Sequence, residues 1–237
     1  MAAARHLMGA GTHSEVHAMP APAGTWRARE YFTAINDHLG VPRDVMADIT
    51  ALQALRAVPG VVPLLSVEAS GTAEVEAWLR ATAPYPADGA SCVRRHMDMP
   101  LRHKNSMFEH VLARRDRRVP YADIQRWMRQ LRVATAETHA RDTLHRDIKP
   151  QNVLVVAAAS TGAGTSVELC DFGLASFAFA PWLSLPEHPA APAANTNRDV
   201  QTLWYRAPEV MLGAGYTAKA DVWSLGVVLA DWLSARP

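Results

Sequence analysis

The sequence predicts an α+β protein with two lobes, a β-rich lobe first and a mainly helical lobe after it. Strand-like apolar runs and a glycine cluster dominate the early part of the chain, whereas long helical patterns follow later. Elements segregated in this way suit an α+β arrangement better than a regular alternation of strands and helices. With 237 residues, 49% hydrophobic and 20% charged, the chain can bury a sizeable core.

A helix is predicted to begin near Pro42, because proline suits a first helical turn and Asp44 lies where the helix dipole favours negative charge. The run at residues 61–65 predicts a short strand. Residues 68–90 are rich in Ala, Thr, Pro and Gly and predict a loop or an insertion. The apolar face of the helix would be formed at helical spacing by Val45, Ile49, Leu52 and Leu55.

The later part of the chain predicts a long amphipathic helix over residues 121–139. Two short apolar runs, 153–156 and 167–169, predict a strand pair with an enlarged turn. Residues 178–197 predict a long exposed loop, and residues 222–233 are apolar all round, as in a buried helix. The apolar face of the long helix would consist of Ile124, Trp127, Met128, Leu131 and Ala134.

Composition argues against several classes of protein. A net charge of +1 provides no global field that would attract nucleic acid or a membrane surface. Two cysteines, Cys92 and Cys170, cannot form a disulfide framework, so we expect an intracellular location, in the nucleus or the cytoplasm. The N-terminus lacks the apolar core of a signal peptide, and no apolar stretch is long enough to span a bilayer. We therefore expect no nucleic-acid partner and no membrane partner.

Residues 145–152 read His-Arg-Asp-Ile-Lys-Pro-Gln-Asn and hold the kinds of side chain that phosphoryl transfer needs. That reaction requires a carboxylate near the attacking hydroxyl, a cation on the phosphates and oxygen ligands for magnesium. Asp147 would orient or accept the hydroxyl proton, and Lys149 would neutralise the migrating phosphoryl group. Asn152 would bind magnesium, and Asp171 of the Asp-Phe-Gly triplet would be the second metal ligand.

These motifs make the chain resemble the catalytic half of a protein kinase. Residues 202–209, Thr-Leu-Trp-Tyr-Arg-Ala-Pro-Glu, resemble the end of the activation segment of the cyclin-dependent kinases, and residues 221–226 resemble the start of the central helix. Residues 42–49 look like an altered version of the helix by which that family grips cyclins. The resemblance runs from about Leu7 to the last residue. It implies ATP and Mg²⁺ as cofactors, a Ser/Thr-Pro protein substrate and a cyclin as candidate partner.

The resemblance also implies a bilobal protein-kinase domain over residues 1–237. The small lobe would cover about 1–95, the hinge about 94–101 and the large lobe about 101–237. Met97 opens the segment that resembles the hinge and would contact the nucleotide. The chain stops just past the central helix, so we expect a C-terminally truncated large lobe without the family's last helices.

A glycine-rich cover for the nucleotide phosphates is recognisable at the start of the small lobe. Gly9 and Gly11 occupy its first two glycine positions, and Ser14 replaces the third. The third position tolerates change better than the first two, because the backbone approaches the phosphates less closely there. Val16 and Ala28 are further candidates for contact with the nucleotide, as implied by the family pattern.

The strand lysine that holds the α- and β-phosphates in the family is missing. The family spacing puts Glu30 at that position, while a one-residue slip or bulge would bring Arg29 inward instead. The lysine's usual partner, a helix glutamate, corresponds to Asp48. Two facing carboxylates about 4 Å apart would cost about 4 kcal/mol at an effective dielectric near 20. We therefore expect damaged activity if Glu30 and Asp48 face each other.

The activation site also departs from the family. The phosphorylated threonine corresponds to Asn197, with Thr196 one residue away. Of the three arginines that gather this phosphate, only Arg146 survives; the other two positions read Ala47 and Ser176. Because the phosphorylation site and its receptor are altered together, we expect that phosphorylation does not order this loop.

Two functions are compatible with this pattern. The first is a serine/threonine kinase that acts through residues 145–152. The second is a pseudokinase, a scaffold that binds a nucleotide or a cyclin with little transfer activity. The intact catalytic loop favours the first. The second is favoured by Glu30, by Arg94 and by the expected absence of the last C-terminal helices. Arg94 and Arg95 occupy the positions expected for the apolar gatekeeper and its neighbouring glutamate.

Overall fold

The computed structural model describes residues 6–10, 14–21, 26–32, 43–69, 95–101, 106–114, 118–156, 164–177, 200–214 and 217–234. The chain forms two compact units, which are described separately here. The first comprises Met1–Val45 and Leu64–Leu101, and the second comprises Met46–Pro63 and Arg102–Pro237. Among the described residues, no helix is both long and apolar enough to cross a membrane.

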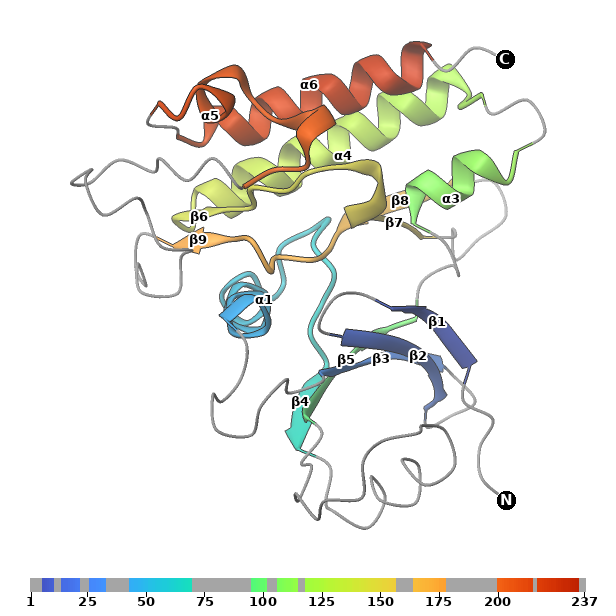
Figure 1. The fold of residues 1–237 in the computed structure, drawn as a ribbon. Coiled ribbons are helices and arrows are strands. Elements are labelled where there is room, and N and C mark those ends of the chain that lie inside the picture. Colours follow the sequence, from blue (N-terminus) through green and yellow to red (C-terminus); the bar gives the residue numbers. More distant parts are fainter. Residues whose placement is uncertain are drawn as a thin grey trace. The chain divides into compact units, whose positions relative to one another are not determined.

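The first unit is built around a five-stranded antiparallel sheet (Figure 1). Along the sheet, β1 (His6–Ala10) pairs with β2 (Ser14–Pro20), and β2 pairs with β3 (Trp26–Phe32). The strand β5 (Arg95–Pro100) then lies between β3 and β4 (Ser66–Ala69). β5 thus occupies most of the segment expected to form the hinge, which places those residues inside the sheet.

The register of the sheet decides which side chains share a face. Residues opposite each other on neighbouring strands point to the same side, and successive residues alternate. Glu30 lies opposite Val16 on β2 and Met97 on β5. Arg29 and Asp98 lie opposite each other and therefore belong to the other face. β2 and β3 pair residue by residue without a bulge, so the expected alternative in which Arg29 turns toward the Val16 face does not occur.

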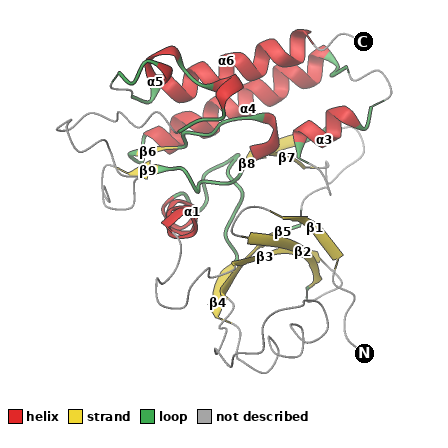
Figure 2. Ribbon diagram, in the orientation of Figure 1, coloured by secondary structure: helices red, strands yellow, loops and turns green. Residues whose placement is uncertain are grey.

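The second unit is mainly helical (Figure 2). Its helices are α1 (Arg43–Ala54, whose first three residues belong to the first unit), α3 (Met107–Leu112), α4 (Tyr121–His139), α5 (Pro208–Met211) and α6 (Lys219–Ser234). Two short antiparallel pairs accompany them: β6 (Thr143–Leu144) with β9 (Ser176–Phe177), and β7 (Val153–Val156) with β8 (Ser166–Leu169). Single 3₁₀ turns form at Pro150–Asn152 and Leu203–Tyr205.

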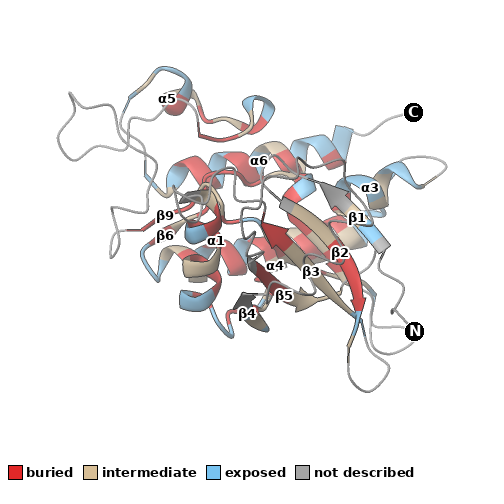
Figure 3. Ribbon diagram, turned by 60° about the horizontal axis from the view of Figure 1, so that its bottom comes forward, coloured by how far each residue is buried: buried red, intermediate tan, exposed pale blue. Residues whose placement is uncertain are grey.

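The core of the second unit lies where α4 packs against α6 and β8. Trp127 of α4 is 1% exposed, and its ring meets that of Trp232 of α6 edge to face, with centroids 5.8 Å apart. Figure 3 shows buried residues along α4 and α6, with exposed residues also present on α6. Val222, Trp223 and Leu233 are about half exposed, so α6 is not buried all round as its composition predicted.

A short connection ties the end of α1 to β8. Gly60 O accepts the Leu169 N–H at 2.7 Å, and the Val62 N–H donates to Leu169 O at 2.9 Å. Val61 forms only an isolated parallel bridge with Leu169, so the predicted strand over residues 61–65 is wrong. Pro63 has no N–H to donate to a ladder, and the strand begins only at Ser66.

Most of the other predicted elements are confirmed. The long helix spans Tyr121–His139, as predicted, and the predicted strand pair forms between β7 and β8. The central helix is longer than its apolar run, because it begins at Lys219 and ends at Ser234. The predicted loop over residues 178–197 lies outside the described residues, as does most of the predicted insertion.

Candidate active site

The carboxylate of Asp147 is held by three neighbouring side chains. Lys149 Nζ lies 2.6 Å from Oδ2, and the Thr202 hydroxyl donates to Oδ1 at 2.7 Å. The Thr202 backbone N–H also donates to Oδ1, at 2.9 Å, and the Asn152 amide donates to Oδ2 at 3.2 Å. These contacts fix the orientation of a buried carboxylate that retains four hydrogen-bond donors.

Asp147 stays ionised in this setting. Burial by itself raises the pKa of Asp147, but the hydrogen bond and charge of Lys149 and the Thr202 hydroxyl bring it below its ordinary value. Lys149 is held in turn, because its Nζ donates to Thr202 Oγ1 at 2.9 Å. The structure thus brings Asp147 and Lys149 together and adds Thr202, whose contact with this loop was not predicted.

Asn152 and Asp171 offer oxygen atoms of the kind that magnesium prefers. The Asn152 amide donates to Asp147, and these bonds do not use its Oδ1. The carboxylate of Asp171 accepts the Gly173 N–H only at 3.4 Å. Desolvation and the charge of Asp147 raise the pKa of Asp171. The charge of His145 acts in the opposite direction but does not cancel this rise. A divalent cation would offset the repulsion between the Asp147 and Asp171 carboxylates. Asn152 and Asp171 therefore fit a site for Mg²⁺.

A larger metal cluster is not present among the described residues, where no group of three or more His, Cys, Asp or Glu side chains is suitably placed. Two protein ligands suit magnesium, which keeps several of its waters and is usually bound through one or two carboxylates together with substrate phosphates.

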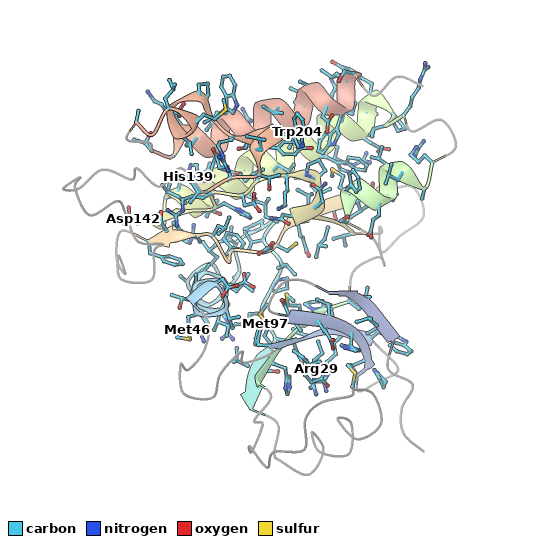
Figure 4. The ribbon with its side chains drawn as sticks, viewed as in Figure 1. Arg29, Met46, Met97, His139, Asp142 and Trp204 are labelled. Atoms are coloured by element: carbon cyan, nitrogen blue, oxygen red, sulfur yellow. The ribbon has the colours of Figure 1, made fainter. Side chains whose placement is uncertain are left out.

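Asp221 at the start of α6 holds the backbone of the catalytic loop. Its Oδ2 accepts the His145 N–H at 2.9 Å, and its Oδ1 accepts the Arg146 N–H at 2.8 Å. His139, labelled in Figure 4, places Nε2 2.8 Å from the same Oδ2. Asp221 is 1% exposed, so these partners replace the water that it loses on burial.

This role of Asp221 was missed from the sequence, which indicated only the start of a helix. The available signal was an acid in the first turn of an otherwise apolar helix.

His145 links the catalytic loop to the Asp-Phe-Gly triplet. Its Nδ1 accepts the Asp147 N–H at 3.2 Å, so in the neutral ring Nε2 is the donor to Cys170 O, also at 3.2 Å. The ring lies against Phe172, with centroids 4.5 Å apart. Phe172 itself is fully buried, and its N–H donates to Asp48 Oδ1 at 2.7 Å.

The Arg146 guanidinium donates hydrogen bonds to backbone carbonyl groups. Nε donates to Leu174 O at 2.7 Å and Nη2 donates to Ala175 O at 3.2 Å. Arg146 is 1% exposed, and its φ of 63° lies in the left-handed region, which a surrounding structure must impose on a non-glycine residue. Ala47 and Ser176, which replace the other two phosphate-gathering arginines, are both buried.

Gln201 positions the backbone next to Asp147. Its side-chain amide donates to Ala220 O and to Ser224 Oγ, each at 2.9 Å, and its Oε1 accepts the Ala207 N–H at 2.9 Å. The following residue is Thr202. The buried Gln201 therefore fixes the neighbour that holds Asp147, a role that was also missed from the sequence.

The remaining site candidates lie in the first unit. Gly9 lies opposite Val16 in the β1–β2 pair, whereas Gly11 lies outside the described residues. Val16 and Glu30 lie on one face with Met97, and Ala28 follows the same alternation.

Arg29 lies on the other face of this sheet; it and Met97 are labelled in Figure 4. Its guanidinium bonds to both oxygens of Asp98, at 2.7 and 2.9 Å. It therefore does not share the face of Glu30, and the two residues are not alternative ligands of one site.

Arg95 was expected at the glutamate position that follows the gatekeeper, and it is the first residue of β5. Arg95 pairs with Phe32, and Met97 is the residue that lies opposite Glu30. Arg94 lies outside the described residues.

The fold and the catalytic loop define a class of protein, and the comparison with known families agrees. The model of the protein kinase domain family matches residues 6–237, and the chain belongs to that family. The prediction of a kinase fold with a β-sheet lobe and a helical lobe is therefore confirmed.

Among curated proteins, the chain is similar to one described as cyclin-dependent kinase F-2 from Oryza sativa subsp. japonica. The two are 39% identical over 125 residues, 52% of this chain and 33% of the relative. A mitogen-activated protein kinase of Saccharomyces cerevisiae is 42% identical over 100 residues, 42% of this chain and 18% of the relative. One from Candida albicans is 41% identical over 100 residues, 42% of this chain and 17% of the relative. The chain thus spans a third or less of these relatives.

Proposed function

We propose that this chain is the kinase domain of an ATP-dependent serine/threonine protein kinase that phosphorylates Ser/Thr-Pro sites. The observation that carries the proposal is the buried, ionised Asp147, held by Lys149 and Thr202. A carboxylate fixed in this way can accept a hydrogen bond from a substrate hydroxyl and orient that oxygen for attack.

The other residues of the loop have supporting roles in this proposal. ATP with Mg²⁺ would supply the γ-phosphoryl group and neutralise its charge. Asn152 Oδ1 and the Asp171 carboxylate would hold the metal ion, and Lys149 would contribute positive charge beside Asp147. Asp221 and Gln201 would keep the loop in this arrangement through buried hydrogen bonds.

The preference for proline after the target residue rests on resemblance. Residues 202–209 read as in the cyclin-dependent kinases, and one relative is described as such a kinase. A cyclin-type partner is proposed on the same basis, with α1 as its contact. Met46 on α1 is 38% exposed and would be available to such a partner.

The decisive test is transfer of the γ-phosphoryl group to a Ser-Pro peptide with Mg²⁺, in the presence and absence of a cyclin. Asp147→Asn is the control, because it keeps the size of the side chain but removes the carboxylate. Wild-type transfer at least about a hundredfold above the control is expected, in the range of general-base effects. Transfer equal to that of the control would contradict the proposed kinase activity. It would favour the alternative, a scaffold that binds a nucleotide or a cyclin.

A second experiment concerns the missing strand lysine. Glu30 lies on the face of Val16 and Met97, so Glu30→Lys would place a cation where the family has one. We expect a gain of at least about tenfold in kcat/KM, equivalent to about 1.4 kcal/mol of transition-state stabilisation. Arg29→Lys is the matched control, since it changes a cation on the opposite face. An unchanged rate in Glu30→Lys would contradict this assignment of position 30.

A further inference from the structure

The side of α4 that faces solvent carries two arginines, Arg129 and Arg132. Trp127 and Leu131 of this helix are buried, so the opposite side is exposed. Residues that recur at helical spacing lie together on that exposed side. The face belongs entirely to the second unit. We call it the arginine face, and it consists of Gln125, Arg129, Arg132, Val133 and Ala136.

The charges of Arg129 and Arg132 are not balanced along the helix. Residues three or four positions apart are neighbours on a helix surface, and neither arginine has an aspartate or a glutamate at that spacing. Within the described ranges, neither arginine forms a hydrogen bond or an ion pair. Asp123, the acid in the first turn, is bonded to Arg126 instead. Arg126, Arg129 and Arg132 are therefore like charges one turn apart, an arrangement that by itself destabilises a helix.

The same helix balances its charge elsewhere. Near its C-terminal end, Glu137 Oε2 lies 2.6 Å from Nη1 of Arg141, four residues later. Across residues 114–132 the sequence has seven arginines, two aspartates and no lysine, a net charge of +5. The whole chain carries only +1, so all its other residues together carry −4. The positive charge is thus concentrated on one stretch of the chain, and a surface of this kind is complementary to an acidic partner.

The side chains of the arginine face indicate which kind of acid it binds. A guanidinium forms paired hydrogen bonds to a carboxylate and is more weakly hydrated than an ammonium group. Val133 is 45% exposed and lies one turn after Arg129, so an apolar surface adjoins the cations. A polypeptide offers both carboxylates and apolar side chains, whereas a nucleic-acid backbone offers phosphates.

We propose that the arginine face of α4 binds an acidic segment of a partner protein, in which Asp or Glu residues are interspersed with apolar ones. Arg129 and Arg132 hold the carboxylates, and Val133 contacts an apolar side chain of the segment. Arginine is among the residues enriched in protein interfaces, which agrees with this assignment. The binding does not depend on phosphoryl transfer at Asp147.

Fluorescence anisotropy of a short labelled peptide, measured with the full chain, tests this proposal. The peptide is rich in Glu with interspersed Leu, and a peptide with Gln in place of each Glu is its control. We expect Arg129→Glu combined with Arg132→Glu to weaken binding of the Glu peptide at least about tenfold. Arg56→Glu combined with Lys219→Glu is the matched control, because it changes the net charge equally at two exposed positions outside α4. Its affinity should stay within about twofold of wild type, since distant exposed charges are screened by salt.

NMR chemical shifts locate the bound peptide, and we expect the largest changes at the backbone amides of Arg129, Arg132 and Val133. Equal weakening in the variant of Arg56 and Lys219 would overturn the proposal, because it would show a response to net charge alone. Equal binding of the Gln peptide, or no binding of the Glu peptide by the wild type, would overturn it as well. Duplex DNA that binds more tightly than the Glu peptide, with the same dependence on Arg129 and Arg132, would exclude the choice of a protein partner.

Discussion

At the scale of single residues, Arg146 differs most from the behaviour implied by its motif. In a phosphate receptor the guanidinium must face the incoming anion, yet here it is buried and donates to the carbonyls of Leu174 and Ala175. Those two bonds already tie the segment after the Asp-Phe-Gly triplet to the catalytic loop. These hydrogen bonds therefore hold the segment against the catalytic loop without a phosphate.

This arrangement predicts an activation loop that is insensitive to phosphorylation. Thr196→Glu, or stoichiometric phosphorylation of Thr196, should change peptide phosphorylation by less than about twofold, because a receptor with Ala47 and Ser176 in place of two arginines gathers an anion poorly. Thr196→Ala is the control for loss of the hydroxyl. Thr196 lies outside the described residues, so the assay is the direct measurement. A tenfold rise in activity would contradict the expectation.

The candidate site could be predicted residue by residue only where its members are close in sequence. Asp147, Lys149 and Asn152 lie within one short motif, and the structure groups them as the motif implies. Thr202 bonds to Asp147 across 55 residues of sequence, and Asp221 bonds to His145 of the same loop across 76. These contacts form because α6 and the residues before it pack against the catalytic loop. A local sequence pattern does not reveal such long-range packing.

At the scale of elements, the buried carboxylate of Asp98 holds β3 against β5. Asp98 is fully buried and bonded by Arg29 from the facing strand, and Arg27 Nη1 lies 2.8 Å from its Oδ2. Burial raises the pKa of Asp98, but the hydrogen bond and charge of Arg29 outweigh this effect and place it below its ordinary value. The ion pair also fixes the alternation that places Glu30 on the opposite face.

Removal of this carboxylate should destabilise the first unit. Asp98→Ala leaves Arg29 largely buried without its partner and should cost about 3 kcal/mol in urea unfolding at neutral pH. Ser66→Ala is the matched control, since its hydroxyl reaches Asp98 only at 3.4 Å, and it should cost less than about 0.5 kcal/mol. Equal stabilities of the two variants would contradict the role of the ion pair.

The same group predicts the acid dependence of stability. Its folded pKa is lower than its unfolded pKa of about 3.9, so its contribution is complete well above that value and is lost as the pH falls through the folded pKa. Urea unfolding followed from pH 6 downward should show a shallower acid decline in Asp98→Ala than in the wild type. Parallel declines in the two proteins would contradict the assignment of the lowered pKa to Asp98.

Gly60 permits the turn between α1 and its contact with β8. Its φ is +82°, and a Cβ there would lie 3.0 Å from Ala134 Cβ on α4. Gly60→Ala should therefore lower stability by about 2 kcal/mol, from left-handed strain and crowding together. Gly226→Ala in α6 is the contrasting control, because its Cβ would meet nothing within 4 Å; it should stabilise by about 0.5 to 1 kcal/mol. Thermal unfolding measures both, and a Gly60 variant as stable as wild type would contradict the turn's requirement.

Helices were predictable from sequence where the apolar pattern repeats over several turns, and strands were predictable where a turn separates two apolar runs. The helix at Tyr121–His139 carries five turns of one apolar face, and β7 and β8 are separated by small residues. The prediction of a strand at residues 61–65 was wrong because Val61, Val62 and Leu64 are apolar for packing, while Pro63 interrupts any ladder. β5 (Arg95–Pro100) was not predicted, because its residues were assigned to the hinge.

At the scale of the whole molecule, the order of the chain and the division into units do not coincide. Met46–Pro63 belongs to the second unit, although sequence from the first unit flanks it on both sides. The sequence suggested a simple succession of a small and a large lobe, and the contacts of Gly60 and Val62 with Leu169 show why part of α1 and its tail belong with the later residues.

This division predicts which strands lose protection when packing just after α1 is damaged. Leu55 is 1% exposed, and Leu55→Ala should cost about 3 kcal/mol. Hydrogen exchange should show loss of protection in β7 and β8 of the second unit, while β2 and β3 of the first unit keep theirs. Gln53→Ala, an exposed position two residues earlier at the end of α1, is the control and should leave both units unchanged. Loss of protection in β2 and β3 equal to that in β7 and β8 would contradict the division.

The Arg29–Asp98 ion pair limits the ways in which mutation can restore a strand cation. Because Arg29 is held on its own face, no sliding of β3 delivers it to the face of Val16, and residue 30 itself must change. A glutamate codon becomes a lysine codon through a single base substitution. A lysine at position 30 is therefore one point mutation away, and variants at codon 30 in related genomes would record whether selection maintains the carboxylate or merely tolerates it.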